Sequence, residues 1–407
     1  MNCRFCNTRL IHLFASVGPS PLSNSYLTKE QLHKMEPYYP LDVYVCENCF
    51  LVQLEEFESP KNIFSDYAYL SSYSDTWLNH ARTYVQKMID VFGIDKKSHV
   101  VEIASNDGYL LQYFIEKKIP VLGIEPAANV AEIAKQKGIP TEAIFFGAKT
   151  AQRLATEGKH ADLLLGNNVL AHVPDLNDFV AGLKILLKPH GVITMEFPHL
   201  MRLMEETQFD TIYHEHFSYF SFLTVKKVFE EHELTLFDVE ELSTHGGSLR
   251  IYAKHEEDTM KPISERVIEL EQREINAGHT DINHYLAFAE KVQAVKRDIL
   301  SFLIKAKNEG KIIVGYGAPA KGNTLLNYCG VRTDFIDYTV DKNPYKQRRY
   351  LPGSRIPIEA PDKIRETKPD YVFILPWNLK GEIMEQMSFI HEWGGRFVIP
   401  IPRVEIM

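Results

Sequence analysis

The sequence predicts an α/β protein in which a small metal-binding domain precedes two doubly wound parallel-sheet domains. Two observations predict this fold. Four of the five cysteines form two C-x-x-C pairs near the N-terminus, and short β-rich runs alternate with amphipathic helices over most of the remaining chain. The 407 residues are enough for two or three domains. We therefore expect a zinc-binding domain over residues 1–74, a ligand-binding α/β domain over 75–260, and a helical linker with a second α/β domain over 261–407.

The composition excludes several classes of protein. The 45 Lys+Arg against 54 Asp+Glu give a formal charge of −9, which disfavours nucleic acid as a ligand. Apolar runs such as Val192–Phe197 are much shorter than the roughly 20 residues that cross a bilayer, and Cys3, Arg4 and Cys6 stand where a signal peptide has its apolar core. We expect a cytoplasmic protein without a nucleic-acid or membrane partner. The sequence leaves open whether it is a monomer or a homodimer.

The paired cysteines indicate a metal site. Cys3-x2-Cys6 and Cys46-x2-Cys49 each place two thiolates on one side of an ion, and tetrahedral Zn²⁺ takes four such donors. Chance pairs of buried thiols are the alternative, but two pairs in one N-terminal segment make it the weaker one. Four thiolates leave no open position for water, so we expect a structural ion, and this ligand set favours zinc over iron.

The first 74 residues show little helical periodicity and several proline and glycine turn signals, as in a small domain stabilised by a metal. From Asp75 to Met88, apolar residues recur at spacings of three and four. We therefore expect a helix there that leads into the next domain.

Residues 99–197 alternate between strand-like and helix-like runs, which predicts a parallel sheet with ligands at the carboxyl ends of its strands. The expected strands are His99–Ala104, Val121–Glu125, Asp162–Gly166 and Val192–Phe197, and the expected helices are Tyr109–Lys117, Val130–Lys137 and Leu176–Leu187. Leu234–Leu242 and Ser248–Lys254 then predict an antiparallel hairpin. A hairpin that closes a parallel sheet is the arrangement of class I methyltransferases.

The last part of the chain repeats the α/β pattern after a helical stretch over Ile263–Ile275 and Tyr285–Lys307. Gly310 ends that stretch, as a glycine after a helix C-terminus does. The strand-like and helix-like runs that follow are Lys311–Gly315, Asn323–Tyr328, Tyr338–Val340, Tyr371–Leu375 and Arg396–Ile399. We therefore expect two Rossmann-like units after the metal-binding domain.

Three turns at predicted strand ends of the middle domain together favour a nucleoside cofactor. Their small and polar residues are, in chain order, Ala104, Ser105, Asn106, Gly108, Glu125 and Asn168. An acidic side chain about 21 residues after the first turn suits a ribose diol, as at adenosylmethionine and NAD sites. Methyltransferases usually have E/D-x-G-x-G-x-G in the first turn, and here Ala104 and Asn106 replace the first two glycines. Any one of these turns, taken alone, is more often structural.

The segment Asp210–Tyr219 contains the run Tyr213, His214, Glu215 and His216. This density of titratable groups favours acid–base chemistry, with a polar structural loop as the alternative. Metal binding is a competitor. However, histidines at i and i+2 suit metal ligands only on a strand or an irregular loop, and H-E-x-x-H is absent from the sequence.

Two further segments carry candidate groups. Asp66–Tyr73 clusters hydroxyls at the junction of the first two expected domains, where a hydrogen-bonding linker is the simpler interpretation. Val314–Asn323 follows a predicted strand and opens a helix, and its turn glycines, helix N–H groups and Lys321 suit a diphosphate. It departs from G-x-G-x-x-G, which disfavours NAD, and a purely structural βα turn is the alternative.

Together these motifs resemble the sugar-nucleotide C-methyltransferases of deoxysugar pathways. The resemblance covers nearly the whole chain. Its six motifs are the paired C-x-x-C, E-I-A-S-N-D-G at 102–108, G-I-E-P at 123–126, N-N-V-L-A-H-V-P-D at 167–175, Y-H-E-H-x-S-Y-F at 213–220 and G-Y-G-A-P-A-K-G at 315–322. The resemblance implies a structural zinc in the first domain and S-adenosylmethionine in a class I methyltransferase domain in the middle. The implied reaction is methyl transfer to C-3 of a nucleotide-linked 4-keto-6-deoxysugar, usually linked to dTDP.

Matching the sequence to these motifs residue by residue gives the expected roles in the reaction. His216 would remove the C-3 proton, and turnover would fall as the pH drops through its pKa. Tyr213, His172 and Tyr67 would lie near the keto oxygen or the neighbouring hydroxyls. Glu215 would orient or tune His216, or hold a sugar hydroxyl.

The resemblance also implies the binding residues. Glu125 would bind the ribose hydroxyls of adenosylmethionine, and Asn168 would lie at the edge of that site. The methionine side of the cofactor would be lined by Ala104, Ser105, Asn106 and Gly108. The nucleotide diphosphate would lie in the last domain, against Gly317, Lys321 and Asn323.

Three other functions stay open at this point: an O- or N-methyltransferase, a non-catalytic zinc-stabilised nucleotide-binding module, and an NAD-dependent oxidoreductase. The run at 213–216 argues against the binding module, which needs no base beside a cofactor cleft. The sequence does not identify the nucleotide, the sugar or the product stereochemistry. It also leaves Tyr69 as an alternative to Tyr67, because an extended strand points both the same way.

Overall fold

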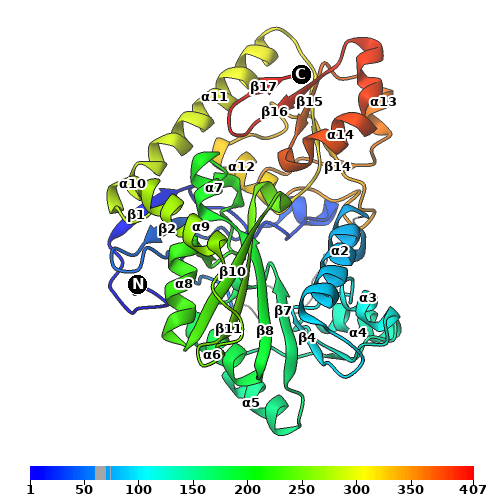
Figure 1. The fold of residues 1–407 in the computed structure, drawn as a ribbon. Coiled ribbons are helices and arrows are strands. Elements are labelled where there is room, and N and C mark those ends of the chain that lie inside the picture. Colours follow the sequence, from blue (N-terminus) through cyan, green and yellow to red (C-terminus); the bar gives the residue numbers. More distant parts are fainter. Residues whose placement is uncertain (60–69, 74) are drawn as a thin grey trace.

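The computed structural model describes residues 1–59, 70–73 and 75–407 and arranges them around three sheets. Figure 1 shows the middle α/β domain at the bottom, the C-terminal α/β domain at the top, and the N-terminal segment crossing between them. The expected zinc-binding N-terminal domain, followed by two Rossmann-like units, is confirmed. In the part of the chain that the structure describes, no helix has both the length and the apolar composition for a membrane crossing.

The N-terminal sheet is small and antiparallel. Its own strands are β1 (His12–Ser16), β2 (Asp42–Val45) and β3 (Val52–Leu54), with the 3-10 helix η1 (Lys29–His33) between the first two. The fourth strand, β9 (Ser218–Tyr219), comes from the middle of the chain and pairs with β3, Gln53 opposite Ser218. The segment that follows His216 therefore completes the sheet of the N-terminal domain.

The middle domain is a seven-stranded sheet in the order β10-β11-β8-β7-β4-β5-β6. Its parallel strands are β4 (Val100–Ile103), β5 (Val121–Ile124), β6 (Thr141–Glu142), β7 (Ala161–Asn167) and β8 (Leu187–Pro198), which pairs in parallel with β7. The predicted antiparallel hairpin is confirmed as β10 (Leu234–Leu242) and β11 (Ser248–His255). The central strands are apolar and buried, which is what a parallel sheet covered on both faces requires.

Helices cover both faces of this sheet. One face packs against α2 (Asp75–Phe92), α3 (Leu111–Glu116) and α4 (Ala128–Gln136). The other face packs against α5 (Ala148–Thr156), α6 (Leu176–Leu186), α8 (Phe222–Glu231) and α9 (Glu265–Asn276). The same apolar cluster includes Cys3, Cys46 and Cys49, so the metal-binding turns are built onto the core of the middle domain.

The C-terminal sheet has the order β14-β13-β12-β15-β16-β17. Its strands are β12 (Ile313–Tyr316), β13 (Thr339–Val340), β14 (Ile358–Glu359), β15 (Tyr371–Ile374), β16 (Arg396–Ile399) and the antiparallel β17 (Glu405–Ile406). Its helices are α12 (Ala320–Cys329), α13 (Lys363–Thr367) and α14 (Lys380–Gln386). The linker before this domain consists of α10 (Ile282–Leu286) and α11 (Phe288–Asn308). The middle domain also contains the short helix α7 (Leu200–Glu205).

One apolar core joins the N-terminal sheet to the C-terminal domain. Phe14 of β1 stacks on Phe288 of α11, with ring centres 4.6 Å apart and planes 12° apart. This core continues from α11 into the C-terminal sheet. The N-terminal segment is therefore packed against both α/β domains, where Figure 1 shows it.

Candidate active site and metal centre

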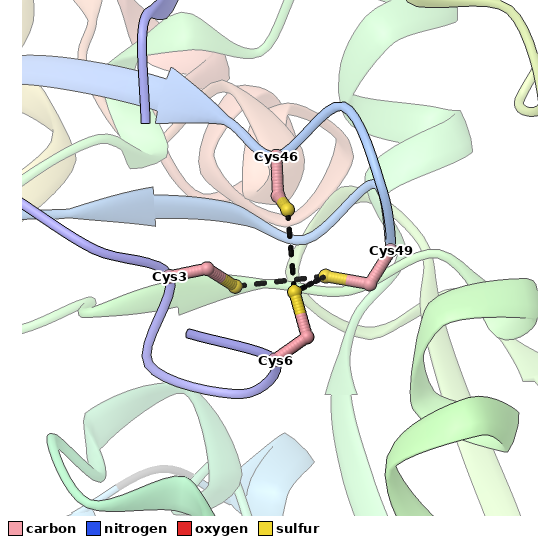
Figure 2. Close-up of side chains that lie close together, drawn as sticks. All are labelled: Cys3, Cys6, Cys46 and Cys49. Carbon is pink, nitrogen blue, oxygen red and sulfur yellow. Dashed lines mark hydrogen bonds between the residues drawn. The ribbon is translucent and has the colours of Figure 1, made fainter. Parts of the chain in front are cut away.

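The four paired cysteines converge on one point (Figure 2). The Sγ atoms of Cys6 and Cys46 are 3.5 Å apart, and Sγ of Cys49 is 3.6 Å from those of both Cys3 and Cys6. All four sulfur atoms lie within 4.8 Å of one another. A tetrahedral ion with Zn–S bonds of about 2.3 Å needs sulfurs about 3.8 Å apart. The donor set therefore fits zinc, and the four predicted ligands are found in one cluster.

The two C-x-x-C turns share one backbone geometry. The carbonyl of the first cysteine accepts a hydrogen bond from the N–H four residues on, from Asn7 to Cys3 and from Phe50 to Cys46, at 3.0 Å in both. Asn7 and Phe50 have φ of 59° and 62°, in the left-handed region that is strained for a bulky side chain. The Phe50 ring stacks on Tyr285 at 5.6 Å, and this packing helps to hold it there.

The turn after β4 has the shape that a ligand-binding turn needs. Ala104 and Asn106 have φ of 56° and 49°, a left-handed conformation that glycine adopts freely, asparagine tolerates and alanine disfavours. They stand where E-x-G-x-G-x-G has its first two glycines, so the backbone keeps the shape of that motif although the side chains differ. Gly108 has φ of 77°, and a Cβ there would lie 2.1 Å from Cδ1 of Ile139.

Glu125 lies just past β5, beside this turn. Its carboxylate accepts hydrogen bonds from the N–H groups of Asn106 and Ala127, both at 2.9 Å. Burial raises the pKa of Glu125, and these two N–H groups act against that rise. The carboxylate oxygens keep further lone pairs that ribose hydroxyls can use.

Glu102, near the end of β4, is the clearest sign that this turn binds a positively charged ligand. It is 0% exposed, and neither carboxylate oxygen has a hydrogen-bond partner among the described residues. Burial and the nearby carboxylates of Glu125 and Asp107 raise its pKa well above the usual value. A ligand ammonium would offset this cost, and adenosylmethionine carries one. The residues therefore fit this cofactor. In the sequence, Glu102 could have been identified by its place at the acidic position of the E/D-x-G pattern.

Two polar side chains lie at the edge of this turn. Oγ of Ser105 is buried and has no partner within the described residues. Asn168, after β7, has φ of 54°, and its Nδ2 is 3.1 Å from Nε2 of His245. His245 lies in the hairpin turn η5 (Thr244–Gly246), itself with φ of 55°. His245 was not among the residues predicted from the sequence, although a histidine beside two glycines at the end of a closing hairpin is a usable signal.

His216 lies between η4 (Phe209–Thr211) and β9 and is buried. Its Nδ1 is 2.9 Å from the carbonyl oxygen of Thr211. Because a carbonyl only accepts, Nδ1 carries the proton and Nε2 carries a lone pair, which accepts the hydroxyl of Tyr213 at 2.9 Å. Burial lowers the pKa of His216 well below 6.5, so the ring is neutral at pH 7. A neutral, fixed imidazole of this kind can act as a base.

His172, at the end of η3 (Leu170–His172), packs against this base. The ring centres of His172 and His216 are 4.7 Å apart at an interplanar angle of 78°. Burial lowers the pKa of His172 to about 4. The structure therefore brings together His172, Tyr213 and His216 from the proposed catalytic set.

The other two residues of the run at 213–216 face the N-terminal domain. Oε1 of Glu215 accepts a hydrogen bond from Nδ2 of Asn24 at 2.6 Å. Nε2 of His214 lies 3.2 Å from the carbonyl oxygen of Pro40. Of the remaining sequence-based candidates, Tyr67 and its alternative Tyr69 lie outside the described residues.

The start of α12 brings the C-terminal domain to the same region. Nζ of Lys321 donates to Oδ1 of Asn378 at 3.0 Å and lies 4.6 Å from the ring centre of Trp377. The Trp377 indole donates to Oδ2 of Asp210 at 2.7 Å, and burial raises the pKa of Asp210 to about 6. Asp210, three residues before Tyr213, was not singled out from the sequence. It has no local motif, since its partners are far along the chain.

The other two predicted substrate contacts differ from each other. Asn323 is 0% exposed, and its side-chain amide has no partner among the described residues, so it is available to a ligand. Gly317 has φ of 89°, and a Cβ there would lie 2.5 Å from Cδ of Pro376. Glycine is therefore required here because Pro376 of the same chain lies so close.

The fold and these turns define a class I adenosylmethionine-dependent methyltransferase. Three family models match the chain: a putative zinc binding domain over residues 3–64, a methyltransferase domain over 77–239, and a C-methyltransferase C-terminal domain over 243–402. The C-methyltransferase NovU of Streptomyces niveus is 35% identical over 410 residues, which cover 100% of this chain and 96% of NovU. The chain belongs to the C-methyltransferase family, and the resemblance drawn from its motifs is confirmed. Its cofactor is S-adenosylmethionine, and its metal is the zinc of the four cysteines.

Two solved structures are each similar to about half of the chain. The magnesium protoporphyrin IX methyltransferase of Synechocystis PCC 6803 with bound SAM is 14% identical, with a TM-score of 0.35, over 48% of this chain and 88% of that one. The PH0226 protein of Pyrococcus horikoshii OT3 is 15% identical, with a TM-score of 0.38, over 49% of this chain and 99% of that one.

Proposed function

We propose that this C-methyltransferase adds a methyl group to C-3 of a nucleotide-linked 4-keto-6-deoxysugar, with dTDP as the nucleotide. The observation that carries the proposal is the base. His216 is neutral, its Nδ1 proton is fixed on Thr211, and its Nε2 lone pair faces a tyrosine hydroxyl beside a second histidine. Transfer to carbon needs a base that removes a proton from carbon, and a neutral, fixed imidazole meets this need. A histidine can also take the proton of a hydroxyl or an amine, so the preference for carbon is supported by the C-methyltransferase family match.

The proposed reaction begins with proton removal. The C-3 hydrogen lies next to the C-4 ketone, so its loss leaves an enolate, and Nε2 of His216 takes the proton. The hydroxyl of Tyr213 must turn from Nε2 to the keto oxygen for this to happen. Tyr213 and His172 then donate to the developing oxygen charge, and each such contribution is worth a few kcal/mol as an order of magnitude.

Carbon–carbon bond formation completes the reaction. Adenosylmethionine, when bound, supplies an electrophilic methyl group. Glu102, Glu125 and the turn over 104–108 would hold the cofactor so that its methyl group could pass to the C-3 carbanion, with the electron pair of the sulfur–methyl bond left on sulfur. The proton on His216 then passes to water, which regenerates the neutral base.

The binding residues divide between two domains. For adenosylmethionine we propose Glu102 at the amino group, Glu125 at the ribose, and the turn over 104–108 with Asn168 around the remainder. For the nucleotide sugar we propose Lys321 and Asn323 as diphosphate contacts, with Gly317 shaping their turn. For Glu215, which accepts a hydrogen bond from Asn24, we propose the role of orienting the loop of His216. Free thiolates at the zinc site fit a reducing compartment, so we propose a cytoplasmic enzyme.

Product analysis with [methyl-¹³C]adenosylmethionine tests this function. We expect the wild type to give a product whose labelled methyl is bonded to ring carbon C-3 by NMR, and His216→Asn to give none. His190→Asn is the control, since the His190 side chain is 72% exposed. A labelled methyl on oxygen or nitrogen would contradict the proposal. Product formed from a GDP-linked sugar but not from the dTDP-linked one would correct the nucleotide alone.

A further inference from the structure

Arg4, in the first metal-binding turn, contacts the loop that carries His172 and the loop that carries His216. Arg4 lies between the zinc ligands Cys3 and Cys6. Its guanidinium donates to the carbonyl oxygen of Pro174 at 3.1 Å and also to the carbonyl oxygen of Leu54. Arg4 therefore bridges two segments that are far apart in the sequence.

The partners of Arg4 are the immediate neighbours of the paired histidines. Pro174 is two residues after His172, in the same loop. The guanidinium carbon also lies 5.5 Å from the ring centre of Phe217, the residue directly after His216. Arg4 thus contacts a residue close to each of the two histidines in the sequence.

The same segments are joined by backbone hydrogen bonds into a closed circuit. The N–H of Leu54 donates to the carbonyl of Phe217 at 3.0 Å, and the N–H of Phe217 donates to the carbonyl of Ala171 at 2.7 Å. Arg4 closes the circuit, since it binds the carbonyls of Leu54 and Pro174. Each of these segments is therefore hydrogen-bonded to two others.

Gln53 fixes Arg4 from the side of the metal. Its Oε1 accepts the backbone N–H of Arg4 at 2.9 Å, and its Nε2 lies 3.2 Å from Sγ of Cys3. Gln53 is 0% exposed, and its backbone pairs with Ser218 in β9, two residues after His216. A continuous set of contacts therefore runs from a zinc ligand to the loop of the base.

We propose that Arg4 is a positioning residue that holds the loops of His172 and His216 against each other, so that the zinc-binding turn sets the geometry of the base. Two carbonyl oxygens from different segments match the planar fork of a guanidinium, whereas a lysine ammonium has no such fixed fork. In its catalytic consequence the proposal rests on the proposed function.

Steady-state kinetics of Arg4→Lys and Arg4→Met test the catalytic consequence. We expect Arg4→Met to lower kcat at least about tenfold, because small displacements of a catalytic group are costly. KM for the nucleotide sugar should stay within about twofold, since Arg4 does not touch the proposed sugar-nucleotide residues. The acid limb of the pH–kcat profile should move to higher pH, because looser loops admit water to His216. Arg4→Lys, the milder variant, should fall between Arg4→Met and the wild type.

Arg9→Met is the matched control, because Arg9 is an exposed arginine of the same segment. We expect it to keep wild-type kinetics, and all variants to keep the zinc content of the wild type by metal analysis. Arg4 variants with wild-type kcat and pH profile would overturn the proposal. So would a loss of kcat that only follows the loss of zinc or of folded protein.

Hydrogen exchange followed by mass spectrometry tests the positioning role without any substrate. In Arg4→Met the peptides that cover 169–176 and 213–219 should exchange faster than in the wild type, whereas Arg9→Met should leave them unchanged. Equal exchange in all three proteins would overturn the proposal. If the wild type does not methylate the sugar but exchange changes as expected, the proposed function fails and the positioning role stands.

Discussion

The two α/β domains build the same turn and use it differently. In the middle domain, Glu125 after the second strand accepts the N–H of Asn106 in the first βα turn at 2.9 Å. In the C-terminal domain, Asp341 after β13 accepts the N–H of Ala318 in the corresponding turn at 2.8 Å. The backbone design is thus shared, and it does not by itself decide which turn binds a ligand.

The difference lies in what surrounds each turn. In the middle domain, Glu102 and Ser105 keep buried polar atoms that have no partner among the described residues. In the C-terminal domain, the hydroxyl of Tyr26 and Nζ of Lys346 donate to the carbonyl oxygen of Ala318 at 2.7 and 2.9 Å. The turn of the middle domain therefore leaves a carboxylate and a hydroxyl for a ligand, whereas the turn of the C-terminal domain uses a carbonyl to hold Tyr26 of the N-terminal segment and leaves the amide of Asn323 for a ligand.

The largest expected effect separates the two acidic residues. Glu125→Ala should raise the Kd for adenosylmethionine at least about 100-fold, because two charge-assisted hydrogen bonds to the ribose hydroxyls, roughly 1.5–3 kcal/mol each, would be lost. Asp341→Ala should leave that Kd within about twofold. Isothermal titration calorimetry of both variants measures this contrast. An equal rise in Kd for both variants would contradict the proposed difference between the two turns.

The histidines around the middle site should make its stability depend on pH. Burial lowers the pKa of His172 and of His245 to about 4, against about 6.5 in the unfolded chain. The unfolded chain therefore binds protons first as the pH falls. The stabilisation is complete above about pH 6.5 and is lost as the pH falls towards 4.

Thermal unfolding of His172→Asn measures this contribution. The drop in Tm between pH 7 and pH 4.5 should be smaller in the variant than in the wild type, because one protonatable buried ring is gone. The exposed-site variant His190→Asn should show the wild-type drop. An identical drop in all three proteins would contradict the assignment.

A smaller and opposite pair of effects is expected at Glu102. Its raised pKa means that the unfolded chain releases the proton first as the pH rises, so ionisation opposes folding near pH 7. Glu102→Gln removes this cost, and Tm of the cofactor-free protein should rise by about 1 °C for each kcal/mol recovered, because the entropy of unfolding grows with chain length. The Kd for adenosylmethionine should nevertheless rise about tenfold, because one charge-assisted contact is lost. Differential scanning calorimetry and titration calorimetry measure the two effects, and a lower Tm would count against an unpaired carboxylate.

The smallest expected effect concerns the shape of the turn. Ala104→Gly relieves a left-handed residue but adds freedom to the unfolded chain, so we expect a net stabilisation of about 0.5 kcal/mol. Ala131→Gly, inside α4, should instead destabilise by about 1 kcal/mol. Urea denaturation measures both values. If both variants change the free energy of unfolding in the same direction, Ala104 is not strained in this turn.

Local signals predicted most of the fold and part of the site. The hairpin strand Leu234–Leu242 has the same bounds as β10, and the cysteine pairs form the cluster that their spacing predicts. Both features depend on residues close together in the sequence, where periodicity and turn chemistry act. β8 is less well predicted: it begins at Leu187 rather than Val192, because Lys188–Gly191 lack the apolar character of the buried part of the strand.

Contacts between distant segments could not be predicted. The two-residue strand β9 has no periodicity of its own and exists because β3 pairs with it. Asn24 meets Glu215 across 191 positions, and Trp377 meets Asp210 across 167. Such pairs follow from how the domains pack, and no motif in a single sequence records them.

Deuterium wash-in at C-3 tests the central claim most directly. The 4-keto-6-deoxysugar nucleotide is incubated in D₂O with S-adenosylhomocysteine, which permits enolisation but no methyl transfer, and exchange at C-3 is followed by NMR. We predict that the wild type exchanges the C-3 hydrogen and that His216→Asn does so about 10²–10⁴-fold more slowly, as for loss of a general base. The wild-type rate should persist below pH 6.5, because burial lowers the pKa of His216. Equal exchange rates in the two proteins would contradict the role of His216. A wild type that methylates the sugar but never exchanges its C-3 hydrogen would contradict an enolate intermediate.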